Sequence, residues 1–248
     1  MSGRYDQDVD DLDDAEPEGH RHRDVQSGGA RAAVFGMSDG LVTNVSLILG
    51  VAAANPGAGI VRLTGFAGLI AGAFSMASGE YVSMQAQREL LQRELDIERR
   101  ALRREPKRER DELLAIYTKR GIDVGVASEL VDQVMQDPEL ALETHAREEL
   151  GINPDELGRP LQAAVSSFFT FAVGAFLPLI PWLFTSGTAA IIGSVVIGVI
   201  ASLAVGALLG SFTGRSRVRS ALRQLGVSTL AAGVTYLVGR LIGVGIHS

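Results

Sequence analysis

The chain contains no cysteine, which excludes disulfide bonds and metal sites built on thiolates. It also lacks acidic residues in its last third: all 29 lie before residue 157, and none occurs from Leu161 to Ser248. Because 21% of the residues are charged while the mean hydropathy is +0.19, the charge must be concentrated in part of the chain. The net charge of −6 therefore averages unlike segments, and it indicates no nucleic-acid partner.

Motifs for phosphate binding are missing as well, because neither a Walker motif nor a glycine-rich phosphate loop occurs. This argues against an ATP-driven pump, and no organic cofactor is predicted. Residues 1–29 are rich in aspartate and poor in large apolar side chains, a composition typical of a disordered tail. The tail also lacks the apolar core of a signal peptide.

Five apolar runs follow the tail, each close to the ~20 residues that a membrane-spanning helix requires. They occupy residues 33–54, 63–82, 164–184, 188–210 and 226–246. The third run contains Pro178 and Pro181, which should kink its helix or end it near the membrane interface, where Trp182 is expected. Glycines at four-residue spacing, such as Gly68 and Gly72, would let helices approach closely in lipid. The chain is therefore predicted to be an all-α membrane protein with five transmembrane helices.

The distribution of arginine and lysine predicts the orientation of these helices. Residues 83–160 contain 13 of them, and the link after the fourth run contains four arginines, whereas the links at 55–62 and 185–188 offer only Arg62. Positively charged loops remain in the cytoplasm. We therefore expect a cytoplasmic amino terminus, a cytoplasmic 83–160 segment and a carboxyl terminus outside.

The segment 83–160 is too periodic to be a linker, and it predicts a helical metal-binding domain inserted between the second and third spans. Helix-forming residues continue the second span without a breaker until Pro106, so that helix should project beyond the membrane. Three shorter helices should follow, with their ends at Gly121, before Pro138 and at Gly151. The predicted divisions are a tail (1–29), spans 1–2 (30–82), the cytoplasmic domain (83–160) and spans 3–5 (161–248).

Asp39 and Glu80 are the only acids in the five runs. A carboxylate inside the membrane is costly and usually marks an ion or proton pathway. Asp39 and Met76 each lie ~9 Å from the cytoplasmic ends of their spans, and Glu80 lies one turn from Met76, so the three can converge. The methionine thioether favours Fe²⁺ or Mn²⁺ over Mg²⁺. Alternatively, Asp39 caps a helix within its run and Glu80 extends to the interface.

Three pairs of potential metal ligands occur in the inserted domain, each spaced so that both side chains share a helix face. They are Glu94 with Glu98, Glu109 with Glu112, and His145 with Glu149. Any one pair is typical of a solvated helix surface, but three pairs on adjoining helices, one with an imidazole, favour a divalent-cation site rich in oxygen ligands. The Glu-x-x-His signature of di-iron enzymes is absent, since Leu142 stands three residues before His145.

Three segments, "SDGLVTNVSLILG", "GAFSMASGEYVS" and "HAREELGI", resemble the vacuolar iron transporter family, in its bacterial and nodulin-21-like branch, over about residues 31–246. The resemblance implies a homodimer of five-span subunits that exchanges Fe²⁺ or Mn²⁺ for protons and moves the metal out of the cytosol. The family's transmembrane ligands fall on Asp39 and Met76. Its cytoplasmic glutamates fall on Glu98, Glu112 and Glu149, with His145 where plant members have a methionine.

The chain departs from the family pattern at Gly68, where plant members have a pore glutamate, and at Ala101, where a cytoplasmic glutamate is expected. Glu80 can compensate for the first change, and the second implies fewer bound metals. Two other functions are compatible with the sequence. One is a membrane-anchored metal buffer or sensor, which has no use for Asp39, and the other is a membrane di-iron oxidase, against which the missing signature argues. We predict a multi-pass transporter, not an enzyme, in a bacterial cell membrane.

Overall fold

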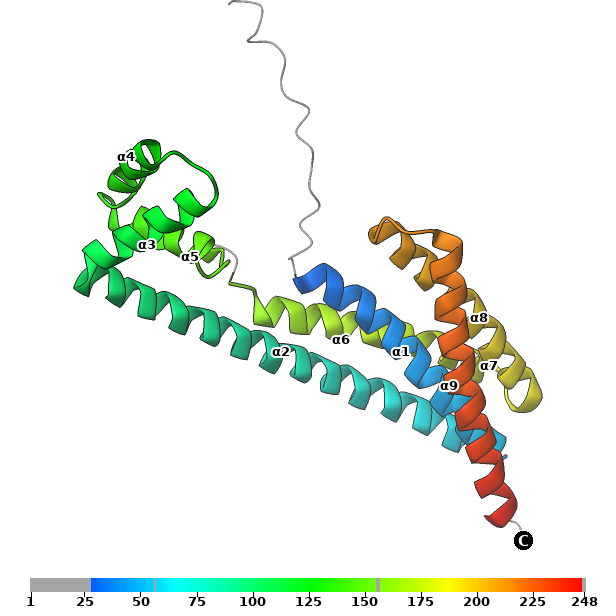
Figure 1. The fold of residues 1–248 in the computed structure, drawn as a ribbon. Helices are drawn as coiled ribbons and strands as arrows, with labels where there is room; N and C mark the ends of the chain where they lie inside the picture. Colours follow the sequence, from blue (N-terminus) through cyan, green and yellow to red (C-terminus); the bar gives the residue numbers. More distant parts are fainter. Residues whose placement is uncertain (1–27, 56, 155–156, 247–248) are drawn as a thin grey trace, which may run out of the picture.

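The computed structural model describes residues 28–55, 57–154 and 157–246, which form helices and no strand (Figure 1). The tail predicted at residues 1–29 falls outside this part, except for the two glycines that begin the first helix. Five helical segments are long and apolar enough to cross a membrane, which confirms the predicted number of spans. They are α1 (Gly28–Ala53), α2 (Ala58–Arg104), the third span formed by α6 (Pro160–Phe176), η3 (Leu177–Leu179) and α7 (Ile180–Phe184), then α8 (Gly187–Phe212) and α9 (Arg217–Ile246).

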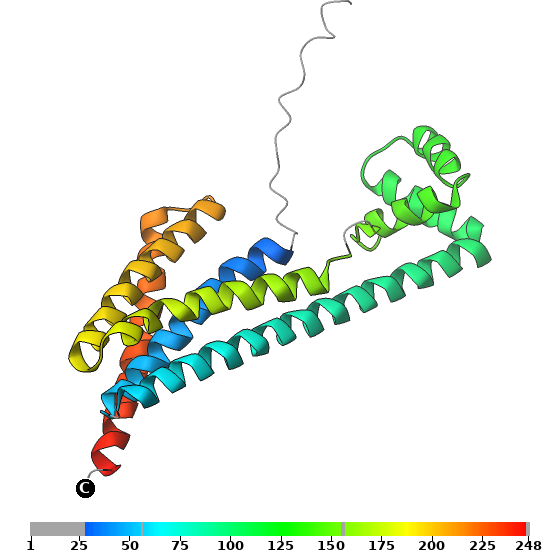
Figure 2. The same cartoon turned by 180° about the vertical axis from the view of Figure 1, so that it is seen from behind.

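Helix α2 is too long to lie wholly in a bilayer. Its 47 residues span ~70 Å at 1.5 Å per residue, against a hydrocarbon thickness of ~30 Å. Its first half is apolar and its second half is rich in charge, and Figures 1 and 2 show it running from the helical bundle to a separate group of short helices. That group consists of α3 (Pro106–Lys119), α4 (Val124–Val134) and α5 (Pro138–Glu148), with ends close to those predicted from proline and glycine.

The inserted helices have a small apolar core of their own. Leu113 of α3, Val131 and Val134 of α4 and Ala141 of α5 are buried together. On the surface, Arg110 of α3 donates to Asp132 of α4 at 2.6 Å. A second cluster of Leu95, Ala146 and Ile152 fixes α5 against the polar half of α2. The insert is therefore attached to α2 along a packed face as well as through the chain.

Within the bundle, α1 and α6 approach at backbone distance. A Cβ atom on Gly40 of α1 would overlap the backbone of Phe171, and one on Gly174 of α6 would overlap the carbonyl oxygen of Met37. On the other side of α6, Gly72 of α2 faces the ring of Phe171 in the same chain. The spacing of these glycines therefore serves contacts within one subunit, where small residues let membrane helices pack closely.

The third span is interrupted where its two prolines fall, because a proline has no N–H for the helical ladder. The chain tightens into a 3₁₀ turn at Leu177–Leu179 and then resumes as α7. Backbone carbonyls in this region accept hydrogen bonds from side chains of three other helices, as a nonaqueous medium requires. The pairs are Asn44 Nδ2 to Ala175 O (2.6 Å), Ser194 Oγ to Pro178 O (2.7 Å) and Arg62 Nε to Trp182 O (2.6 Å).

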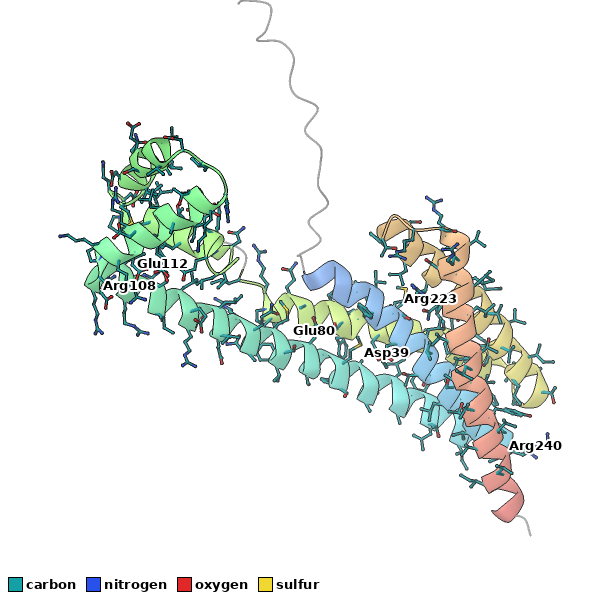
Figure 3. The ribbon with its side chains drawn as sticks, in the orientation of Figure 1. Asp39, Glu80, Arg108, Glu112, Arg223 and Arg240 are labelled. Carbon is teal, nitrogen blue, oxygen red and sulfur yellow. The ribbon has the colours of Figure 1, made fainter. Side chains whose placement is uncertain are left out.

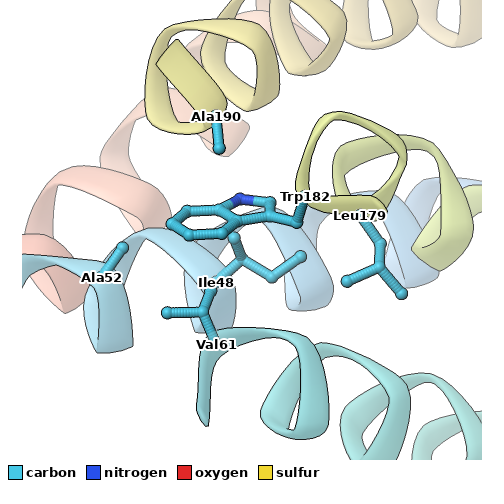
Figure 4. Packing of buried hydrophobic residues seen from close by; sticks show 6 residues of the cluster. All are labelled: Ile48, Ala52, Val61, Leu179, Trp182 and Ala190. Carbon is cyan, nitrogen blue, oxygen red and sulfur yellow. The ribbon is translucent and has the colours of Figure 1, made fainter. Parts of the chain in front are cut away.

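Trp182 lies two residues before the end of α7, where the third span ends, and its side chain points into the bundle. Its side chain is 2% exposed and packs among apolar residues of α1, α2 and α8 (Figure 4). Its indole N–H donates to Ser194 Oγ at 3.0 Å, so the polar edge of the ring is satisfied inside the bundle rather than by water or lipid headgroups.

The contact between α1 and α6 predicts a sharp difference between two glycine substitutions. Gly174→Ala should destabilise the protein by about 1–3 kcal/mol, because the added methyl group overlaps the backbone of α1. Gly226→Ala on α9 should be neutral or slightly stabilising, because a Cβ there meets no atom within 4 Å. Thermal unfolding in detergent measures both, and equal melting temperatures would contradict the packing.

Candidate metal centre

Three side chains from three helices meet in the insert. Glu98 lies on α2, Glu109 in the first turn of α3 and His145 on α5, and one potential ligand atom of each lies within 4.8 Å of the others. All three are buried, His145 completely. The turn at Pro106 folds α3 back against α2, and the Leu95 cluster brings α5 onto the same face, so the local chain path produces this grouping.

Burial and neighbouring acids disfavour ionisation of the two carboxyl groups of this cluster. Glu98 Oε1 is buried and accepts no hydrogen bond within the described part of the chain. Burial raises the pKa of Glu98, and the neighbouring carboxylate of Glu149 raises it further. Burial also raises the pKa of Glu109, with Glu112 as the next cause. Both groups lie beyond the apolar part of α2, and both would be stabilised as carboxylates by a bound cation.

His145 is held between two backbone carbonyl oxygens. Nδ1 lies 2.9 Å from the oxygen of Ala141, and Nε2 lies 3.1 Å from the oxygen of Glu109. A neutral imidazole can donate to only one of them. A metal ion needs a lone pair on a ring nitrogen, so coordination by His145 requires one of these contacts to be released. The histidine therefore also links α3 to α5.

The other predicted ligands lie around this core at different depths. Glu112 is half-buried on α3 (Figure 3) and Glu149 is exposed at the end of α5, and both carboxylates raise the pKa values of Glu98 and Glu109. Glu94 is half-buried one turn before Glu98 and lies outside the three-residue group. Clustered carboxylates with one imidazole suit Mn²⁺ and Fe²⁺, so the donor set fits the predicted ions.

Asp39 lies in the middle of the unbroken helix α1, which rules out the alternative that it caps a helix there. Its side chain is exposed on the single chain, and its carboxylate accepts a hydrogen bond of 3.3 Å from Thr43 Oγ1 one turn along. Figure 3 places Asp39 on α1 and Glu80 on α2 in the middle of the molecule. Met76 packs against the apolar cluster around Phe171. The structure thus places Met76 between α2 and α6, and Asp39 on an open face of α1.

Sequence reasoning overlooked Asn44. Its side chain is completely buried, and its Oδ1 accepts no hydrogen bond within the described residues. A Cβ on Gly68 would lie 3.0 Å from that oxygen, so Asn44 faces the position at which the family pattern has a pore glutamate. The signal was available, since an amide inside an apolar run is itself unusual.

These features define a class: the chain is a multi-pass helical membrane protein whose insert carries a candidate centre for divalent metal ions. The model of the VIT family matches residues 30–240. The chain is 36% identical over 231 residues to the vacuolar iron transporter of Acanthamoeba castellanii, covering 90% of this chain and 83% of that protein. It is 30% identical over 213 residues to vacuolar iron transporter 1 of Arabidopsis thaliana, covering 86% and 85%. The chain belongs to the VIT family.

The electrostatics of the centre predict a pH dependence in metal-free protein. Because the pKa values of Glu98 and Glu109 are higher in the folded insert than in the unfolded chain, protonation favours folding. That stabilisation is complete below the unfolded pKa values and is lost as the pH rises through the folded ones. Amides of α3 and α5 should therefore show more exchange protection, corrected for intrinsic rates, at mildly acidic than at neutral pH. Glu98→Gln should flatten this profile, whereas Glu94→Gln should leave it unchanged.

The same centre predicts selective metal binding. Purified full-length protein should bind Mn²⁺ more tightly than Mg²⁺, because an imidazole among carboxylates favours the transition ion. Replacing both Glu98 and Glu109 by glutamine should weaken Mn²⁺ binding by roughly tenfold or more, since each substitution removes a charged ligand. Glu129→Gln, on an exposed site of α4, is the control. Calorimetry that finds the double variant equal to this control would place the ions elsewhere.

Proposed function

We propose that this protein transports Fe²⁺ and/or Mn²⁺ out of the cytosol in exchange for protons. The observation that carries the proposal is the buried cluster of Glu98, Glu109 and His145, in which Glu98 Oε1 accepts no hydrogen bond within the described residues and which stands on an extension of a membrane-spanning helix. The names of the relatives, vacuolar iron transporters, support iron as a cargo. Manganese, the direction of transport and the proton exchange rest on ligand chemistry and on the family resemblance.

The arginine distribution supports the proposed orientation, with the amino terminus and the insert in the cytoplasm and the carboxyl terminus outside. In that orientation the cluster would collect ions at the side from which they are exported. The second half of α2 would connect the collecting domain to the spans, so that an ion released from the insert meets the membrane near Glu80 and Asp39. This division into a cytoplasmic domain and a transport unit is part of the proposal.

Asp39 supports both the proton exchange and a homodimer. A carboxylate exposed on a helix within the apolar region cannot face lipid without a large cost. A second subunit placed against this face of α1 would enclose Asp39 in a shared, hydrated pathway. There the carboxylate can hold either a proton or a metal ion, which is the exchange that antiport requires. The thioether of Met76 would add a soft ligand for a transition ion.

A membrane-anchored metal buffer or sensor is the second candidate. It is favoured by one observation, namely that the three members of the buried cluster all come from the insert and the polar half of α2. Such a protein would bind metal without moving it, and its spans would serve only as an anchor. Asp39 distinguishes the two functions, because an anchor gains nothing from an intramembrane carboxylate.

Asp39→Asn should therefore abolish most transport while leaving the protein folded. Asparagine keeps the shape and one carbonyl oxygen but cannot ionise, so proton-driven Fe²⁺ flux into or out of proteoliposomes should fall by roughly tenfold or more. Metal binding to the insert should remain. Asp96→Asn, an exposed site on the polar half of α2, is the matched control and should transport normally. Parental flux in the Asp39 variant under the same pH gradient would leave the buffer or sensor as the better account.

A further inference from the structure

Helices α8 and α9 are close near their link and separate farther along, as Figures 1 and 2 show. Near the link, a Cβ on Gly206 of α8 would overlap Ala221 of α9. Toward its other end, α9 leaves α8 and packs on α1, where Gly239 meets the backbone of Gly50. The separation leaves a wedge-shaped cavity of about 280 Å³ between α1, α8 and α9. Its lining includes Val45, Leu49, Val195, Val199, Ala232 and Tyr236.

At the narrow end of the cavity, the buried polar side chains are already hydrogen-bonded, so no polar ligand is needed there. There Ser202 and Ser228 are buried and hydrogen-bonded to each other at 2.9 Å between their hydroxyl oxygens. From Leu225 to Tyr236 the lining on α9 extends over ~16 Å, the length of an extended hydrocarbon segment. A long, apolar cavity between membrane helices is suited to one acyl chain.

Arg240 lies beyond the last residue of α9 that lines this cavity. Arg240 lies one turn beyond Tyr236 on the same stripe of α9, and its side chain is exposed (Figure 3). Within the described part of the chain it has no ion pair or hydrogen bond. It lies ~26 Å along α9 from Arg223, so the two arginines bracket nearly the whole ~30 Å of a bilayer core. Arg240 is therefore close to the membrane surface at which α9 ends.

Within residues 28–55, 57–154 and 157–246, Arg240 has no carboxylate partner. The sequence has no acid from Leu161 onward. Arg240 follows Gly239, which packs on Gly50 of α1. The acid of that helix, Asp39, lies ~16 Å from Gly50 along α1, toward the opposite membrane surface. Within the described residues Arg240 therefore has no counter-ion, and an external anion can supply one. A phosphate fits best, because the planar guanidinium binds phosphate oxygens in a bidentate, charge-assisted manner.

We propose that an anionic phospholipid binds at this place, with one acyl chain in the wedge between α8 and α9 and its phosphate on Arg240. An anionic headgroup is favoured over a zwitterionic one because the latter carries an ammonium group that offsets the phosphate charge. The lipid fills the space that α9 leaves when it turns from α8 to α1, so it supports the position of α9 in the bundle. This binding site is independent of metal transport and of the orientation of the protein in the membrane.

The test compares lipid binding in delipidated full-length protein by native mass spectrometry. Phosphatidylglycerol should bind at one molecule per chain and raise the melting temperature, and phosphatidylcholine should bind more weakly. Arg240→Gln should weaken phosphatidylglycerol binding by roughly tenfold or more. Arg219→Gln, the same change on an exposed site near the other end of α9, should leave it unchanged. Gly233→Leu should also block binding, because its side chain fills the cavity from a position where a Cβ meets no atom within 4 Å.

Three outcomes would overturn the proposal. The first is equal binding of the two lipids, and the second is an Arg240→Gln variant that binds like the Arg219→Gln control. The third is efficient disulfide cross-linking between two chains carrying Tyr236→Cys, which would show that a second copy of the protein covers the wedge. The natural chain has no cysteine, so this cross-link would have no background. The Gly233→Leu variant keeps the test decisive if the Arg240 variant does not fold.

Discussion

The bundle depends on hydrogen bonds that side chains of neighbouring helices make to the interrupted third span, because a backbone carbonyl inside a membrane cannot be satisfied by water. The carbonyls of Ala175, Pro178 and Trp182 are bound instead by side chains of α1, α8 and α2. Each bond fixes one neighbouring helix against the interruption. The buried indole of Trp182 then fills the space at the turn. Three helices are thus hydrogen-bonded to the one interrupted span.

This arrangement also decides which parts of α1 are left open. The face of α1 that carries Gly40 packs against α6, and the face that carries Gly50 packs against α9. Asp39 lies on neither contact and remains exposed. In the proposed function a second subunit covers this exposed carboxylate, which links transport to assembly. The wedge between α8 and α9 is a second open surface, and it differs from the first in carrying a cation at its end.

The insert is under a different constraint, because its buried acids are costly to ionise. Glu98 and Glu109 are buried beside other acids, and their raised pKa values express the cost of ionising them together. Protons relieve that cost, and a bound divalent cation would relieve it as well. In the proposed function, the same residues would therefore release protons as they take up metal. The packing of α5 on α2 holds them in place for either state.

The sequence by itself determined the helices: their number, the long extension of α2 and the ends at Pro106, Gly121 and Gly151 follow from local signals of hydropathy, proline and glycine. It also indicated Glu98, Glu109 and His145 as ligands, because charged side chains are conspicuous in a small polar domain. Only the tertiary structure decided that Trp182 is buried, that Gly72 packs within one subunit, that Asn44 supports the broken span and that Asp39 faces outward. The reason is that lipid is as apolar as the interior of a helix bundle, so hydropathy does not tell which face of a membrane helix packs and which remains exposed.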